Sequence, residues 1–138
     1  MSQIVTSEVL ADADVHRLVD LRLGLLRLHE ALLEMERKSF ERTHGRVNSG
    51  ELLQLVINHA QFAWLRMVSA LVVQIDEMLD ADEPVTDADV NNLITGARQL
   101  FTASKNKEFS DKYQAALQHV PEVVMAHSAL MKLLRPKV

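Results

Sequence analysis

Cysteine is absent from this chain of 138 residues. Without it, disulfide bonds, cysteine-ligated zinc, iron–sulfur clusters and thiol nucleophiles are excluded. The absence also fits a reducing compartment. Residues 1–8 are polar and lack the basic and apolar pattern of a secretory signal peptide. We therefore expect a cytoplasmic protein.

Aromatic residues, glycine and proline are scarce. Aromatic residues make up 4% of the chain, and there are four glycines and three prolines. Four scattered glycines cannot build a phosphate-binding loop, and the Gly-x-Ser-x-Gly motif of covalent hydrolases is missing. Leu, Ala, Glu, Arg and Met are plentiful, and they favour helices. The hydrophobic content of 48% is that of a globular protein rather than a disordered one. These features predict a single all-α domain.

Positive charge is not in excess, because the formal net charge is −4 at pH 7. A broad surface that attracts a phosphate backbone is therefore not expected, and nucleic acid is an unlikely partner. The most apolar stretch, residues 62–75, is interrupted by Arg66 and Ser69 and is too short to span a bilayer. We expect no membrane partner.

A long first helix is predicted after a flexible arm over residues 1–11. Asp12 or Asp14 is the expected cap at its start, and Gly45 is the expected stop at its end. A seam of apolar residues with alternating spacings of three and four marks the buried face. The seam consists of Leu18, Leu21, Leu25, Leu28, Leu32 and Met35.

Further helices follow up to the C-terminus. Asn48 is the predicted cap of a second helix that continues to Leu79, with a bend near residues 58–60 as the alternative. Thr86 is the predicted cap of a third helix, after a loop that contains Pro84. A fourth helical region from residue 109 is broken at Pro121, since proline favours the first turn of a new helix. The predicted architecture is an up-down bundle of about four helices over residues 12–138.

The histidines are candidate ligands, because helical bundles build metal sites from inward-facing side chains. His29, His59 and His127 are expected on three different helices, and Glu36 is a possible carboxylate partner. The Glu-x-x-His pair of di-iron bundles does not occur in the chain. The favoured interpretation is that these histidines lie at the edge of the core and bond to backbone or carboxylate groups, and the metal site is the alternative. No cofactor is predicted.

Two other patterns are weaker pointers to function. Arg22 with His29, and Arg37 with His44, match the loose Arg-x(4–6)-His pattern of helical, metal-independent ribonucleases of the HEPN type. We expect these pairs to belong to a mixed-charge helix surface, and the ribonuclease is the alternative. Residues 76–89 contain seven acidic residues and no base, but they lack the central glycine of a calcium loop. This run is expected to be a solvated loop and helix start.

Protein–protein contact is the leading functional hypothesis. The first two predicted helices have more apolar surface than a monomer needs, which favours a homodimer. Trp64 and Arg66 belong to the residue types that dominate binding hot spots, although the periodicity around Trp64 also suits the core. We therefore expect a non-enzymatic helical protein. A histidine and carboxylate ligand site and a ribonuclease are the alternatives.

Several short segments also resemble a known family. They are residues 28–33, residues 36–47, residues 50–55, and Phe62-Ala63-Trp64-Leu65-Arg66 followed by Ile75-Asp76-Glu77. Together they resemble an uncharacterised family of small helical bacterial proteins. The resemblance implies a bacterial source, and it brings no assigned activity or cofactor.

Overall fold

The described part of the chain consists of helices and the short loops that join them. The computed structural model describes residues 2–135, and the side chains of residues 12–135. Over this range there is no strand, which confirms the all-α prediction. The elements are α1 (Ser2–His44), α2 (Ser49–Asn58), the 3₁₀ helix η1 (Ala60–Leu65), α3 (Arg66–Asp80), α4 (Asp87–Ala103), α5 (Lys107–His119) and α6 (Pro121–Leu133).

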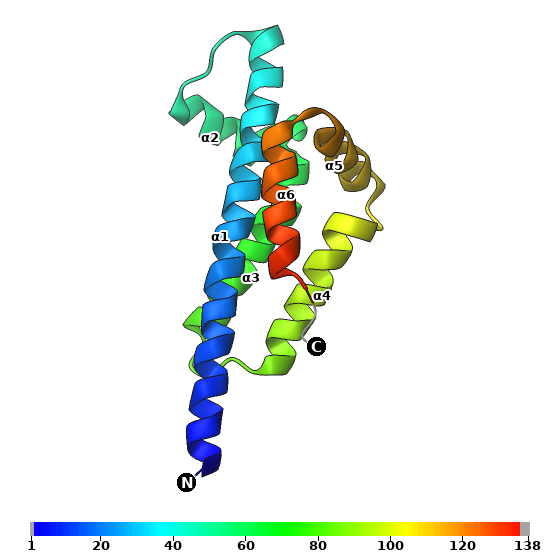
Figure 1. Ribbon diagram of the computed structural model, residues 1–138. Helices are drawn as coiled ribbons and strands as arrows, with labels where there is room; N and C mark the ends of the chain where they lie inside the picture. The colour runs from blue at the N-terminus through cyan, green and yellow to red at the C-terminus, as the bar shows by residue number, and fades with distance from the viewer. Residues whose placement is uncertain (1, 136–138) are drawn as a thin grey trace.

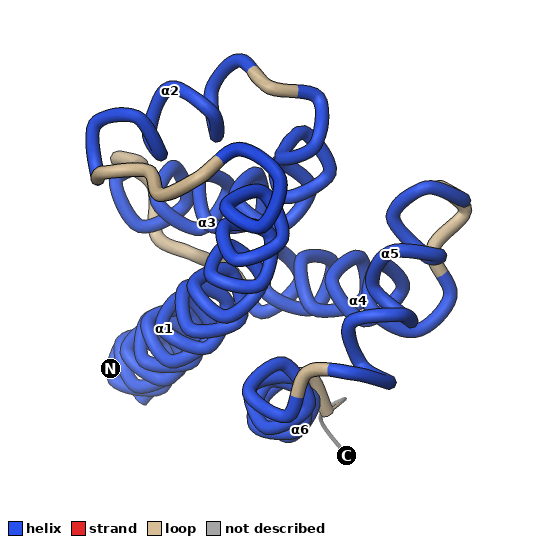
Figure 2. Tube along the Cα trace, turned by 90° about the horizontal axis from the view of Figure 1, so that it is seen from above, coloured by secondary structure: helices blue, strands red, loops and turns tan. Residues whose placement is uncertain are grey.

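The helix α1 is the spine of the fold. Helices α3 and α6 pack along α1 and run antiparallel to it, and α4 and α5 close the side between them (Figures 1 and 2). The leucines of the predicted seam from Leu18 to Leu32 are all buried, and Met35 packs against the core. Phe62, Phe101, Phe109 and Tyr113 fill the space that the other helices enclose. The heptad pattern therefore identified the buried face of α1 correctly.

The two ends of α1 compare differently with the prediction. Its end at His44 is confirmed, because Gly45 has φ of +82° and its amide bonds to the carbonyl of Glu41. Such a left-handed residue closes a helix at low cost only when it is glycine. The predicted cap is wrong, since α1 begins at Ser2 and places Asp12 and Asp14 within the helix. Residue 1 of the predicted arm, and the side chains of residues 2–11, lie outside what the structure describes.

The second predicted helix is not continuous. It ends at Asn58, and the chain then turns by 79° before η1 and α3. His59 has an extended backbone at this bend, and its Nδ1 atom accepts a hydrogen bond from the amide of Gln61. This side-chain bond replaces a helical one, so the bend lies where the alternative prediction put it. No single helix among the described residues has the length and apolar content needed to cross a bilayer.

The remaining helix starts agree with the sequence. Thr86 and Asp89 form a reciprocal capping box at the start of α4. Pro121 stands in the first turn of α6, as predicted. With the breaks at His59 and at Val120, there are six α-helices in the described chain, so the predicted count of about four is not matched.

Candidate functional site

The helix α2 carries an apolar face that the rest of the chain leaves uncovered. The helix contains five aliphatic residues in six positions, of which Leu52, Leu55 and Val56 are partly buried against the core and Leu53 and Ile57 are exposed. The side chains of Leu53 and Ile57 are 57% and 51% exposed. These two residues lie one turn apart on the same side of the helix. We call this surface the α2 face.

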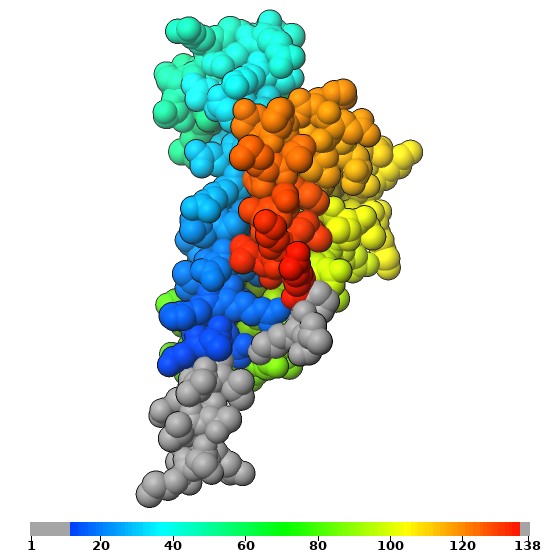
Figure 3. Space-filling model, in the orientation of Figure 1, coloured from blue at the N-terminus to red at the C-terminus, as the bar shows by residue number. Residues whose placement is uncertain are grey.

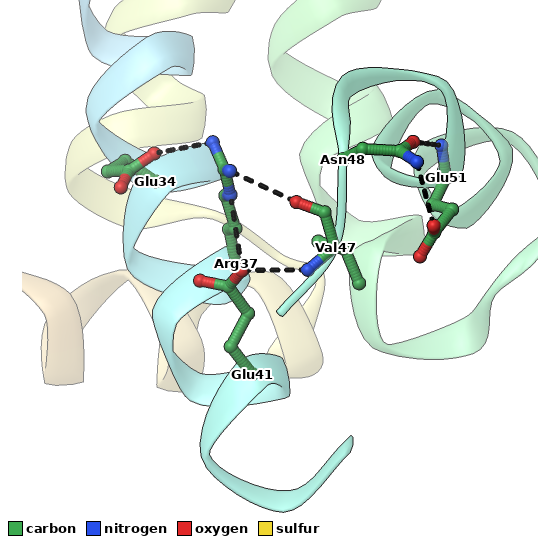
Figure 4. A network of polar contacts seen from close by, with 6 residues as sticks. All are labelled: Glu34, Arg37, Glu41, Val47, Asn48 and Glu51. Carbon is green, nitrogen blue, oxygen red and sulfur yellow. Dashed lines mark hydrogen bonds and ion pairs between the residues drawn. The ribbon is translucent and has the colours of Figure 1, made fainter. Parts of the chain in front are cut away.

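A network of polar side chains fixes the loop that leads into α2 (Figure 4). The guanidinium of Arg37 donates a hydrogen bond of 3.1 Å to the carbonyl of Val47, and the carboxylate of Glu41 accepts one of 2.9 Å from the amide of Val47. Arg37 also lies 3.7 Å from Glu41 and 3.8 Å from Glu34. Both backbone polar groups of Val47 are thus held by α1.

The two ends of α2 are held as well. At its start, the side-chain oxygen of Asn48 accepts a hydrogen bond of 2.8 Å from the amide of Glu51. At its end, the guanidinium of Arg66 donates to the carbonyl of Ile57, across the bend. The positive charge of Arg66 at this position also interacts favourably with the negative C-terminal end of the α2 dipole. The α2 face is therefore presented in a fixed orientation, although little of it is buried.

The helix α1 carries a second uncovered apolar surface. Val15, Val19, Leu23 and Leu26 are exposed, and their spacing places them in one arc of the helix. Val19 and Leu23 are 49% and 48% exposed. The arc lies roughly opposite the buried leucine seam of the same helix. We call it the α1 outer stripe.

A groove between α1 and α6 continues the apolar surface of the outer stripe. The surfaces of these two helices lie side by side on one face of the molecule (Figure 3). The groove has a volume of about 570 Å³, with Ala31, Met35, Ala126 and Met125 among its lining residues. Leu23 lines a smaller hollow of about 200 Å³ that shares Arg27, Ala126 and Ala129 with the groove.

The predicted ligand residues on α1 are partly buried but lie two helical turns apart. Burial lowers the pKa of His29 below its ordinary value. Burial also raises the pKa of Glu36, and a hydrogen bond from Gln61 and the charge of Lys112 oppose this rise. The indole N–H of Trp64 is buried without a hydrogen bond of ordinary geometry, yet it lies close enough to Glu36 to favour the carboxylate form.

The other two predicted ligand residues have structural contacts of their own. His127 lies on α6, where its Nδ1 atom is 2.6 Å from the hydroxyl of Tyr113. His59 caps η1 and packs edge-on against Phe40. Within residues 12–135, no three His, Asp or Glu side chains are grouped so that they could hold a metal ion. The ligand-binding role of His29, Glu36, His59 and His127 stays a prediction.

The predicted partner-binding pair is divided between core and surface. Trp64 is only 4% exposed, and its ring packs edge-on against Phe109, with the ammonium of Lys112 6.0 Å from the ring centroid. Arg66 is exposed and holds the end of α2. Arg66 therefore acts on the α2 face as a positioning residue.

The arginines of the ribonuclease pattern are engaged in structural contacts. The Nε atom of Arg22 lies 2.6 Å from the carboxylate of Asp76 and ties α1 to α3. Arg37 belongs to the network around Val47, while the ring of His44 stacks on Phe40 at 4.1 Å. These contacts support the mixed-charge alternative for both pairs.

The sequence analysis assigned excess apolar surface to the second predicted helix but did not locate it at Leu53 and Ile57. The signal was present, because residues 52–57 hold five aliphatic side chains over more than half of the helix circumference. A helix in a small domain can bury only part of so wide an arc against one neighbour.

In comparisons with known proteins, no family model, no curated protein and no solved structure matches this chain.

Proposed function

We propose that this chain is a non-enzymatic helical protein that acts through protein–protein contact as a homodimer, and that the α1 outer stripe is the dimer contact. The observation that carries the proposal is the exposure of four aliphatic residues along one arc of α1, the helix on which the fold is built. Scattered exposed apolar residues are normal, but a contiguous row is a sign of an interaction surface.

The stripe suits a contact between two copies of the chain. A twofold axis that crosses α1 near residue 21 sets two antiparallel helices side by side. Val19 of one copy then lies opposite Leu23 of the other, and the same pair recurs on the far side of the axis. Such an isologous contact needs only one self-complementary patch, which the stripe provides. It is the commonest geometry of soluble homo-oligomers.

The groove between α1 and α6 enlarges the surface available to the second copy. A stable interface buries about 800 Å² on each partner, more than four side chains supply. Leu23 borders the hollow that joins this groove, so a helix lying on the stripe also contacts α6. Methionine side chains such as Met35 and Met125 adapt their shape to a partner at small cost.

Analytical ultracentrifugation over 1–100 µM in 0.5 M NaCl tests the proposal, because salt at this concentration screens contacts between charged surfaces and leaves an apolar contact in place. We expect the wild-type protein to form a dimer in this range, and Val19→Glu with Leu23→Glu to remain a monomer with unchanged helix content. Val124→Glu is the control, because Val124 is also exposed but lies on α6 outside the groove lining. A monomer for the wild type at every concentration overturns the proposal, and so does a double variant that dimerises like the wild type.

A further inference from the structure

The two ends of the molecule carry opposite charge. Residues 37–66, which form the end of α1, the following loop, α2 and η1, contain five basic and two acidic residues. The chain from Met67 to Ala97 has seven acidic residues and no base. All seven lie in residues 76–89, at the end of α3, in the loop that follows and at the start of α4. Figure 1 shows α2 at one end of the molecule and the turn between α3 and α4 toward the other.

The acidic end also contains a cleft. It lies between the end of α3 and the start of α4 and has a volume of about 600 Å³. Met78, Val85 and Leu93 supply apolar lining, and Glu77 and Glu83 stand among the residues around them. We call this site the acidic cleft. Its surface is thus suited to an apolar group that is flanked by cations.

The α2 face has this composition. Leu53 and Ile57 are exposed, Arg66 donates to the carbonyl of Ile57, and a second exposed arginine, Arg46, lies in the loop that precedes α2. α2 itself has no Lys or Arg on its polar side, whereas helices that lie on membrane surfaces are rich in them. A protein surface of opposite charge is therefore the better match than a lipid surface.

We propose that the α2 face of one copy docks into the acidic cleft of a second copy. The apolar side chains of α2 enter the cleft, while Arg46 and Arg66 approach the carboxylates at its edge. The contact joins unlike surfaces on opposite ends of the molecule. It is therefore heterologous, and it extends head to tail rather than closing into a pair. This inference goes beyond the proposed dimer and uses different surfaces.

Fixed presentation of α2 favours the contact. Binding costs free energy when a loop or helix must first be ordered, and the polar network around Val47 and the bond from Arg66 already order this one. Long-range attraction between oppositely charged ends also speeds encounter and orients it. The long-range attraction depends on ionic strength, because salt screens charges over about 8–10 Å at 0.1–0.15 M.

The test mixes two blocked variants. Each also carries Val19→Glu and Leu23→Glu, so that the proposed twofold contact plays no part. The first has Leu53→Gln and Ile57→Gln in the α2 face, and the second has Glu77→Lys and Glu83→Lys in the acidic cleft. We expect each variant alone to be a monomer. The equimolar mixture contains one intact face and one intact cleft, so it should form a 1:1 heterodimer in ultracentrifugation.

Matched controls and salt define the outcomes. Asp111→Lys with Glu122→Lys makes the same change in charge on α5 and α6 but leaves the α2 face and the acidic cleft intact. In the same outer-stripe background, this control should therefore associate with itself, whereas Glu77→Lys with Glu83→Lys alone stays a monomer. Raising NaCl from 0.1 to 0.5 M should weaken the heterodimer at least about tenfold. A mixture that stays monomeric at about 100 µM overturns the inference. That result leaves the twofold dimer untouched, because the dimer is tested only in chains with an intact outer stripe.

Discussion

Helices α2 and α6 are of similar length, yet the fold holds them in different ways. Helix α6 packs along α1 through Val123 and Leu130, which are fully buried, and Leu134 just beyond its end is buried too. α2 has no fully buried residue: Leu52, Leu55 and Val56 are partly buried against the core, and hydrogen bonds at the ends of α2 and in its preceding loop fix it further. The buried apolar face of α6 stabilises the fold. The exposed part of the apolar face of α2 stays open to a partner, because hydrogen bonds at its ends hold this helix in place.

The largest expected effect separates buried leucines from exposed ones. Leu28→Ala on the inner face of α1 should lower the free energy of unfolding by about 2–5 kcal/mol, because a filled core position becomes a cavity. Leu53→Ala on α2 should change it by less than about 0.5 kcal/mol, as for most surface substitutions. Urea denaturation of both variants at a concentration that keeps them monomeric checks this. Similar losses would show that the α2 face is part of the core.

The close approach of α6 to α1 gives the next effect. A Cβ atom added at Gly24 lies 3.0 Å from Leu133 Cδ1 and 3.3 Å from Leu130 Cδ1. Gly24→Val should therefore force the two helices apart and cost about 1–3 kcal/mol. Gly96→Val is the control, since a Cβ atom there meets nothing within 4 Å. Equal stability of the two variants would contradict the tight packing of α6.

The attachment of α2 by its end is tested by Arg66→Ala. Removing the guanidinium leaves the carbonyl of Ile57 without this donor, so α2 should open more often. We expect amide hydrogen exchange to speed up about five- to tenfold in α2 and to stay unchanged in α6, as a loss of about 1 kcal/mol implies. Arg98→Ala on α4 is the matched control. Faster exchange throughout the molecule would mean that Arg66 supports the whole fold.

The smallest effect is a pH dependence in the part of the fold that includes α6. Burial lowers the pKa of His127 and raises that of Tyr113, so the Tyr113 hydroxyl donates to a neutral His127. The folded state therefore binds a proton at His127 less readily than the unfolded state does. This contribution to stability is complete above the ordinary histidine pKa of 6.5 and is lost as the pH falls below it.

Denaturation at pH 7.5 and pH 5 measures this dependence. Wild-type protein should lose more stability on acidification than His127→Gln does. His29 contributes with the same sign, because burial lowers its pKa too. If the two proteins lose stability equally, the contact between Tyr113 and His127 is not responsible for the change.

The sequence predicted those features that depend on local pattern. The seam from Leu18 to Leu32, the stop at Gly45, the capping box at Thr86 and the break at Pro121 each follow from a few neighbouring residues. The bend at His59 could only be offered as an alternative. The apolar periodicity around it suits one helix or two, and the choice depends on a side-chain bond to the amide of Gln61.

The candidate surfaces were harder to predict than the fold. Periodicity showed that α1 has apolar residues on more than one side, but it could not tell which of them a neighbouring helix covers. Arg66 was singled out beside Trp64, whereas its bond to Ile57 reaches across nine residues and a bend. The charge contrast between the ends became visible only when the fold placed α2 and the turn between α3 and α4 far apart.

The position of Trp64 has a practical consequence. It is the only tryptophan in the chain, and it is buried within η1, the segment that joins α2 to α3. Its fluorescence therefore reports the state of this joint without an added label. Emission that shifts to longer wavelength before the helical signal is lost would reveal a molecule whose joint has opened while the helices remain.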